Sequence, residues 1–221
     1  MKIYNNLNIK NNHKNSVILI GNFDGVHLGH QKVIAQARQK AKKNKLPFGS
    51  ITFEPMPVMF FNSNIKSHRI NSLEQKKIQL KKCRLDFLVI IKFNRFFSLL
   101  SAEQFIKKVI FNKIRSKYVF VSKNFKFGKK RQGNIHTLKK FQNIYDFKTI
   151  VTSPLKKTKK TISSSLIRKK ISLGKIKETN KLLSRPWCVN GKVLKGNKRG
   201  RKIGFPTCNL KLKDYIVPKL G

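Results

Sequence analysis

Short apolar runs typical of buried strands alternate with segments of helical periodicity over most of this chain. The first run, residues 17–20, stops at Gly21, and residues 28–41 then place their apolar side chains on one helical face. Further strand-like runs cover residues 48–53, 87–91, 118–121 and 147–151, and further helices are predicted from Ser101 and over residues 73–83, 135–141, 164–173 and 175–183. This alternation predicts an α/β fold in which helices cover both faces of a parallel sheet.

One predicted helix directs a lysine toward the core. In residues 73–83 the helical spacing places Leu73, Lys77 and Leu80 on the face toward the sheet. The lysine would bury its hydrocarbon stem there and keep its ammonium group in water.

The pattern changes near Arg185 and Pro186. Beyond this point, β-like runs at residues 187–194 and 205–210 flank a stretch rich in glycine and cations. Roughly 35 residues remain, fewer than the roughly 40 below which a domain seldom folds unaided. We therefore expect one domain over residues 1–185 and an incomplete second module over residues 186–221.

The net charge of +43, from 51 Lys and Arg against 8 Asp and Glu, is typical of nucleic-acid-binding proteins. However, 41 of the cations are Lys and 10 are Arg, and the chain also holds 20 Asn, 23 Ile and 17 Phe. These four abundant residues all have codons built only from A and T, so codon bias explains the charge equally well. A basic nucleic-acid-binding protein stays an alternative, although the cations are spread over the chain and no specific nucleic-acid partner is expected.

The remaining composition predicts a cytoplasmic protein without a membrane partner. The three cysteines, Cys83, Cys188 and Cys208, form no Cys-x-x-Cys pair, which argues against a zinc site or a disulfide framework. Residues 1–15 contain no apolar signal region, and the longest apolar runs are too short to cross a bilayer.

The segment Gly-Asn-Phe-Asp-Gly-Val-His-Leu-Gly-His, residues 21–30, joins the first strand to the first helix, where a parallel sheet binds anionic ligands. His27 and His30 are three residues apart, so both rings can face one phosphate, and Gly29 leaves room for the ligand. In the alternative interpretation, one histidine caps the helix and the other packs in the core. Asp24 either orients the loop, lies near Mg²⁺, or simply forms an Asp-Gly turn.

A second candidate anion site lies at the start of a later helix. Ser163, Ser164 and Ser165 offer hydroxyls and free N–H groups there, and Arg168 follows one turn later. An ordinary helix N-cap is the alternative. Elsewhere, Phe53, Phe125 and Phe127 could stack on an aromatic ligand, although core packing explains each of them as well.

Residues 21–30 resemble the His-x-Gly-His nucleotidyltransferases. Four further segments narrow the resemblance to the bacterial bifunctional riboflavin kinase/FMN adenylyltransferase (FAD synthetase) family: residues 52–57, 124–128, 162–168 and 199–209. The resemblance implies a Rossmann-like nucleotidyltransferase domain followed by the beginning of a β-barrel riboflavin kinase module. It implies FAD and pyrophosphate formation from ATP and FMN with Mg²⁺. Another His-x-Gly-His transferase, with a different acceptor, is the alternative.

The resemblance also assigns residues. It implies catalytic roles for His27 and His30, and it implies ATP binding by Gly21, Asn22, Phe23, Asp24, Gly29, Ser163, Ser164, Ser165 and Arg168. It implies flavin binding by Phe53, Pro55, Pro57, Asn124, Phe125 and Phe127. The chain departs from the family pattern at Met56, Ser122 and Ser165, where His, Gly and Thr are usual.

The kinase module would use Thr207 and Asn209 to bind nucleotide phosphates and Mg²⁺, and a later glutamate as the base toward riboflavin. Asp214 is the only acid after Asn209 and comes too early to match that glutamate. We therefore expect this polypeptide by itself to lack riboflavin kinase activity.

Overall fold

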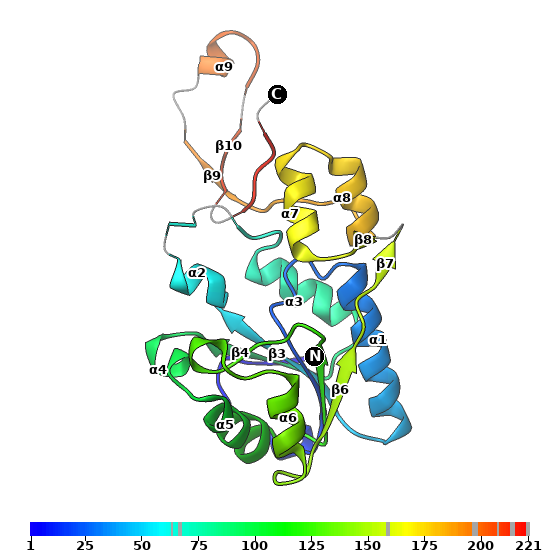
Figure 1. Cartoon of the computed structure of the whole chain (residues 1–221). Coiled ribbons are helices and arrows are strands. Elements are labelled where there is room, and N and C mark those ends of the chain that lie inside the picture. Colours follow the sequence, from blue (N-terminus) through cyan, green and yellow to red (C-terminus); the bar gives the residue numbers. More distant parts are fainter. Residues whose placement is uncertain are drawn as a thin grey trace.

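The computed structural model describes residues 1–62, 64–65, 68–157, 160–195, 199–206, 208–212 and 215–219 (Figure 1). Its centre is a six-stranded sheet with the order β1-β4-β3-β2-β5-β6, in which every neighbouring pair is parallel. The strands are β1 (Lys2–Tyr4), β2 (Val17–Ile20), β3 (Phe48–Glu54), β4 (Phe87–Lys92), β5 (Tyr118–Ser122) and β6 (Lys148–Thr152). The predicted parallel α/β fold is confirmed.

The central strand β2 shows why the sheet needs cover on both faces. It pairs with β3 on one side and β5 on the other, with Val17 opposite Phe48 and Tyr118. All four of its side chains are buried. Ile18 and Ile20 join one apolar cluster, whereas Val17 and Leu19 join the other, as the period of two of a strand requires.

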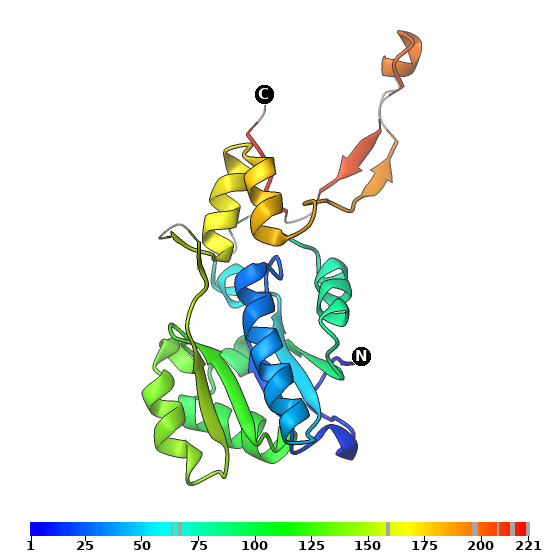
Figure 2. The same ribbon diagram turned by 90° about the vertical axis from the view of Figure 1, so that its right-hand side faces the viewer.

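Helices supply the two apolar covers, on opposite sides of the sheet (Figure 2). Helices α1 (Leu28–Lys43) and α3 (Leu73–Lys82) cover one face, and α5 (Ala102–Phe105), η2 (Ile106–Ile114) and α6 (Ile135–Gln142) cover the other. The predicted capping box at Ser101 is present, with Gln104 as its reciprocal partner. The helix predicted from Ser101 therefore begins where the sequence places it.

The inward-facing lysine of α3 is a different residue from the one the spacing predicts. Lys76 is completely buried together with Gln75 and Leu80, whereas Lys77 is part-exposed and pairs with Glu74. Positions 76 and 80 are one helical turn apart, so the buried face is rotated by one residue from the expected one. The half-buried Lys77 with its ammonium group beside the exposed Glu74 agrees with the prediction, whereas the buried Lys76 was missed because a buried ammonium group depends on distant carboxylates that helical spacing does not reveal.

Two helices, α7 (Ser164–Ser172) and α8 (Ile176–Leu183), lie beyond the carboxyl ends of the strands (Figure 1). Ile167 and Ile171 of α7 and Leu183 of α8 form a third apolar cluster with Ile70, against which Trp187 and Ile216 pack. Residues from the end of the chain therefore contribute to the part of the fold that stands over the sheet.

The C-terminal residues form a small antiparallel pair, β9 (Lys192–Leu194) and β10 (Asn209–Lys211), with α9 (Arg199–Lys202) between them. This arm extends away from the main body (Figure 2). The β-like run expected over residues 187–194 pairs only from Lys192, because the preceding residues bind to the main body instead. Smaller elements are η1 (Asn11–His13), α2 (Pro57–Phe61), α4 (Arg95–Ser98), η3 (Lys129–Arg131), β7 (Lys156–Lys157) and β8 (Lys160–Thr161). In the described part of the chain, no helix is long and apolar enough to cross a membrane.

Candidate active site

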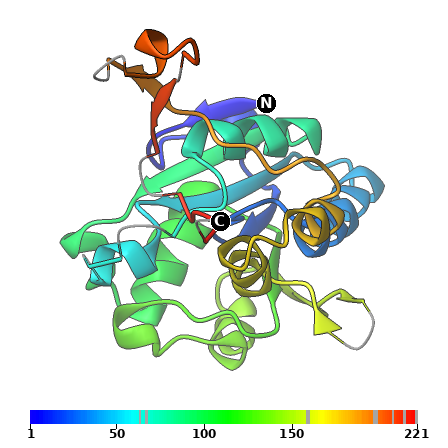
Figure 3. The ribbon, with the colours of Figure 1, turned by 90° about the horizontal axis from the view of Figure 1, so that it is seen from above.

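The strand order reverses at β2, whose neighbours β3 and β5 lead away in opposite directions. Such a switch point opens a crevice outside the carboxyl ends of the strands. A cavity of about 670 Å³ lies there, between the loop after β2, the loop after β5 and the start of α7. The predicted site residues that line it are Gly21, Asn22, Phe23, Asp24, His30, Phe53, Pro57, Asn124, Phe125 and Ser164. Figure 3 shows the fold from above, with α7 and α8 beside the loops.

The loop from β2 to α1 turns tightly and is held by close packing. Gly25 has a φ of +84°, and a Cβ there would lie 3.2 Å from the Ile70 side chain. At Gly29 a Cβ would lie 3.1 Å from the His27 ring and from the carbonyl oxygen of Ile162. The space around Gly29 is thus already occupied by protein atoms, and this glycine permits α1 to begin directly against the segment that enters α7.

The two histidines stack at the N-terminus of α1, with ring centroids 3.7 Å apart. His27 is the N-cap, and its Nδ1 accepts a hydrogen bond of 3.3 Å from the His30 backbone N–H. A neutral His27 ring therefore carries its proton on Nε2. His30 lines the cavity, and its Nδ1 is buried without a hydrogen-bond partner among the described residues.

Both histidines are neutral near pH 7. Burial, together with the positive charges of Arg168 and Arg185, lowers the pKa of His27 to about 4. Burial also holds the pKa of His30 well below its usual value, with smaller contributions from His27 and Lys76. The pair can therefore exchange hydrogen bonds with an anionic ligand, but it contributes no fixed positive charge before a ligand binds.

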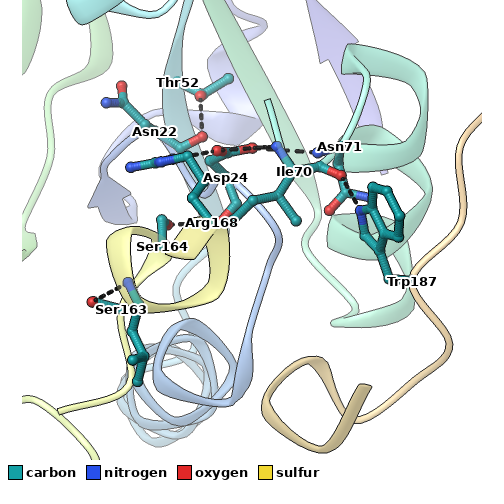
Figure 4. Close-up of polar contacts among 10 residues, drawn as sticks. Asn22, Asp24, Thr52, Ile70, Asn71, Ser163, Ser164, Arg168 and Trp187 are labelled. Atoms are coloured by element: carbon teal, nitrogen blue, oxygen red, sulfur yellow. Dashed lines mark hydrogen bonds and ion pairs between the residues drawn. The ribbon is translucent and has the colours of Figure 1, made fainter. Parts of the chain in front are cut away.

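Asp24 lines the cavity and joins three segments through its polar contacts (Figure 4). Its Oδ1 accepts from the backbone N–H groups of Ile70 at 3.0 Å and Asn71 at 3.4 Å, and its Oδ2 lies 2.8 Å from Nη1 of Arg168. Burial raises the pKa of this carboxyl group, while Arg168 and then Lys76 oppose the shift. Of the three interpretations of Asp24, these contacts match the one in which it orients the loop.

The start of α7 uses most of its predicted anion-binding groups within the protein. Ser163 caps the helix by accepting from the Leu166 N–H at 3.2 Å, and Ser164 Oγ donates to the Asp24 carbonyl oxygen at 2.8 Å. Ser165 is exposed. Arg168 reaches Asp24, so its charge is shared between that carboxylate and the site. Ser164 is the member of this group that lines the cavity.

Three buried or half-buried cations near the loop were missed from the sequence. Lys76 Nζ donates to Thr52 Oγ1 at 3.4 Å, and Thr52 donates to the Asn22 carbonyl oxygen at 3.3 Å. Arg185 donates to the Gly25 carbonyl oxygen at 2.6 Å, and Arg69 pairs with Glu54.

With Arg168, four cations surround the loop against the two carboxylates of Asp24 and Glu54. Burial lowers the pKa of Lys76, whereas Asp24 and Glu54 oppose that shift. The excess of cations suits a polyanionic ligand. A lysine one turn before Leu80 on an apolar helix face was the available sequence signal.

An aromatic cavity of about 500 Å³ adjoins the first and shares Phe53, Pro57 and Phe125 with it. Phe125 and Phe127 stack with their centroids 5.3 Å apart. The rest of the aromatic lining, which was not predicted, consists of Phe61, Phe93, Phe97 and Phe105. Pro55 is half-buried and is in neither lining.

The three positions that depart from the family pattern differ in their surroundings. Ser122 lines the larger cavity, Met56 is buried at the start of α2, and Ser165 is exposed. Of the predicted kinase residues, Asn209 is exposed in β10, paired with Leu194. Thr207 lies outside the described residues.

The parallel sheet, the crevice at its switch point and the histidines at the N-terminus of α1 define a Rossmann-like nucleotidyltransferase. The chain belongs to the FAD synthetase family, whose model matches residues 9–166, and a model described as riboflavin kinase matches residues 183–221.

Relatives carry a name that matches this family, and a solved structure has a similar fold. A bifunctional riboflavin kinase/FMN adenylyltransferase of Buchnera aphidicola subsp. Schizaphis graminum is 43% identical over 95% of this chain and 67% of the relative. The Haemophilus influenzae protein of the same name is 36% identical over 92% of this chain and 66% of the relative. A solved structure described as a macrolide-efflux protein from Streptococcus pneumoniae superimposes with a TM-score of 0.81 at 31% identity. It covers 98% of this chain and 70% of that one.

Proposed function

We propose that this protein is an FMN adenylyltransferase that transfers AMP from ATP to FMN in the crevice above β2 and β5. The observation that carries the proposal is the junction of two unlike cavities. The larger one is lined by polar groups that include His30, which stacks on His27, and the smaller one is lined mainly by phenylalanines; they share Phe53 and Phe125. A substrate pair with phosphates at one end and a flat aromatic ring at the other fits this combination.

The reaction follows from placement and charge stabilisation. The triphosphate lies over the N-terminus of α1, with Asn22 and Ser164 at its edge, and the isoalloxazine ring of FMN lies in the phenylalanine cavity. An oxygen of the FMN phosphate attacks the α-phosphorus of ATP. The new P–O bond forms as the bond to the β-phosphate oxygen breaks, and pyrophosphate leaves with that electron pair.

The chain contributes charge stabilisation at the reacting phosphate. A neutral His30 can donate one ring N–H to a non-bridging oxygen whose negative charge grows in the transition state. His27 holds the backbone of His30 in place through its Nδ1. Arg168, Arg185 and Lys76 raise the electrostatic potential of the whole crevice.

Mg²⁺ is part of this proposal and would enter with the triphosphate. It prefers oxygen ligands and is usually bound through substrate phosphates and water, with one or two protein carboxylates. The described residues contain no cluster of three His, Cys, Asp or Glu side chains, and Asp24 already accepts from two backbone N–H groups and Arg168. We therefore propose that the substrate phosphates and water supply most of the Mg²⁺ ligands, and that side chains supply few.

The same proposal includes a domain boundary at residues 185 and 186 and a cytoplasmic location. The described cysteines, Cys83, Cys188 and Cys208, are all free thiols, as is typical of a reducing compartment.

Calorimetric titration tests the choice of acceptor. We expect FMN to bind with saturation in the presence of a non-hydrolysable ATP analogue, and pantetheine phosphate and phosphocholine to give no heat. Binding of either of these acceptors without FMN binding would assign the crevice to another His-x-Gly-His transferase. Binding of duplex DNA at physiological salt, with no heat from FMN or the nucleotide, would favour the nucleic-acid alternative.

A further inference from the structure

Residues 69–71 form hydrogen bonds in two directions. The N–H groups of Ile70 and Asn71 donate to Asp24 at the candidate phosphate site. The carbonyl groups of Arg69 and Ile70 face the C-terminal part of the chain. There, Trp187 Nε1 donates to the Ile70 carbonyl oxygen at 3.0 Å (Figure 4), and Ile216 N–H donates to the Arg69 carbonyl oxygen at 2.9 Å.

A second connection runs through the side chain of Gln75. Tyr215, which is buried, donates from its hydroxyl to Gln75 Oε1 at 2.8 Å and accepts from the Asn190 N–H at 3.3 Å. Gln75 Oε1 also accepts from the Ser72 N–H at 2.9 Å, where it completes the capping box of α3. The next residue of α3 is the buried Lys76.

Asp24 connects residues 69–71 to groups on the ligand side of the crevice, so a displacement of these residues changes the position of those groups. Its carboxylate holds Arg168, and its carbonyl oxygen accepts from Ser164, which lines the cavity. All these groups are packed tightly, so a shift at residue 70 moves Asp24 or breaks a buried hydrogen bond.

We infer that Trp187 and Tyr215 are positioning residues for ATP: they fix residues 69–71 and Gln75, which in turn fix Asp24 and the loop that receives the phosphates. This inference rests on the proposed function of that loop. Because Trp187 reaches the loop through residues 69–71, we expect ATP binding at the loop to change the surroundings of Trp187 as well. A merely structural attachment of residues 187 and 215 would affect folding but not nucleotide affinity.

The chain contains one tryptophan, so Trp187 itself reports the coupling. We would titrate the full chain with α,β-methylene-ATP and Mg²⁺ in the absence of FMN. The expected result is a saturable change in Trp187 emission, with the same dissociation constant that calorimetry gives. This measurement uses the unmodified protein and does not depend on any variant folding.

Conservative variants provide a second experiment. Trp187→Phe and Tyr215→Phe each delete one hydrogen bond and keep an aromatic ring, and we expect them to raise the KM for ATP roughly 2- to 10-fold. Their kcat and their affinity for FMN should stay unchanged. The matched control is Tyr4→Phe, which deletes a hydrogen bond of 2.8 Å from another buried tyrosine to His13, at the far edge of the sheet.

The possible results distinguish the positioning role of Trp187 and Tyr215 from the proposed function of the loop. If calorimetry detects nucleotide binding while Trp187 emission stays constant and both variants bind like the unmodified protein, the positioning role is wrong and the proposed function stands. If the unmodified protein binds no nucleotide by calorimetry, both are wrong. A loss of ATP affinity in Tyr4→Phe as large as in the other two variants would also contradict a specific positioning role.

Discussion

The loop between β2 and α1 differs from the C-terminal arm in burial and in bonding. The polar groups of the loop are buried and hydrogen-bonded, whereas the apolar side chains of the arm are exposed. In the loop, Asp24 is buried and bonded to Ile70 and Arg168, which are far away in the sequence, whereas His27 is buried and bonded to the backbone of His30. In the arm, every residue of β9 and β10 is exposed, and the apolar side chains of Ile203 and Phe205 are 72% and 75% exposed. The protein therefore fixes its charged site by long-range contacts, while the two described strands of the arm leave their side chains exposed.

The loss of unfolding free energy should be much larger when the buried ion pair of the loop is broken than when an exposed ion pair is broken. Arg168→Met leaves Asp24 buried without its cation, so we expect the free energy of unfolding to fall by about 3 kcal/mol. Lys117→Met removes an exposed pair with Asp146 and should cost less than about 1 kcal/mol. Urea unfolding followed by circular dichroism measures both. Equal losses for the two variants would show that the buried network adds nothing beyond an ordinary surface pair.

The next largest effect is on catalysis. His30→Ala removes the donor proposed for the reacting phosphate, so we expect kcat for FAD formation to fall roughly 10²- to 10³-fold. His136→Ala, at an exposed position in α6, should leave kcat unchanged. Flavin products separated by chromatography give the rates. Full activity of His30→Ala would remove this residue from the mechanism.

Acid should weaken the loop first. The pKa of folded His27 is about 4, below its unfolded value of 6.5, so the unfolded state binds more protons between these values. Stability is therefore full above pH 6.5 and is lost as the pH falls toward 4, by ~1 kcal/mol per pH unit for this group. His30 shifts in the same direction.

The variant His27→Asn isolates this effect, because asparagine can cap α1 without titrating. Its unfolding free energy should depend less steeply on pH between 6.5 and 4 than that of the unmodified protein. Parallel curves for the two proteins would mean that His27 does not titrate on unfolding.

The smallest effect is expected in the arm. Phe205→Ser replaces an exposed side chain, so the free energy of unfolding should change by less than about 0.5 kcal/mol and the KM for ATP should not change. Thermal melts and steady-state kinetics measure the two quantities. A several-fold rise in KM would mean that the arm, and not only Trp187 and Tyr215 at its ends, acts on the site.

Local patterns predicted the parts of the fold that local physics determines. The strand at Val17–Ile20, the helix after it and the capping box at Ser101 all follow from apolar periodicity or from neighbouring residues. Strand β1 was missed because it is short, polar at Lys2 and placed at the edge of the sheet, where burial leaves little pattern. Ten residues to which the family motifs give a role line the larger cavity, and their roles stay predictions.

What the sequence did not reveal are contacts between distant segments. Arg168 was predicted beside the phosphates, but the structure directs it to Asp24, 144 positions away. The N–H groups of Ile70 and Asn71, and the Trp187 indole that holds the other side of this segment, have no local signature. The tertiary fold decides which buried polar groups pair, so spacing along the chain does not predict these pairs.

AMP transfer to FMN is tested by following the α-phosphate of ATP. The full chain would be incubated with FMN, Mg²⁺ and ATP labelled with ³²P at the α-position, beside the His30→Ala variant. If the crevice is an FMN adenylyltransferase site, we expect labelled FAD, unlabelled pyrophosphate in equal amount, and little labelled FAD from the variant. Label that stays in ATP while FMN is unchanged, or that appears in another acceptor, would contradict it.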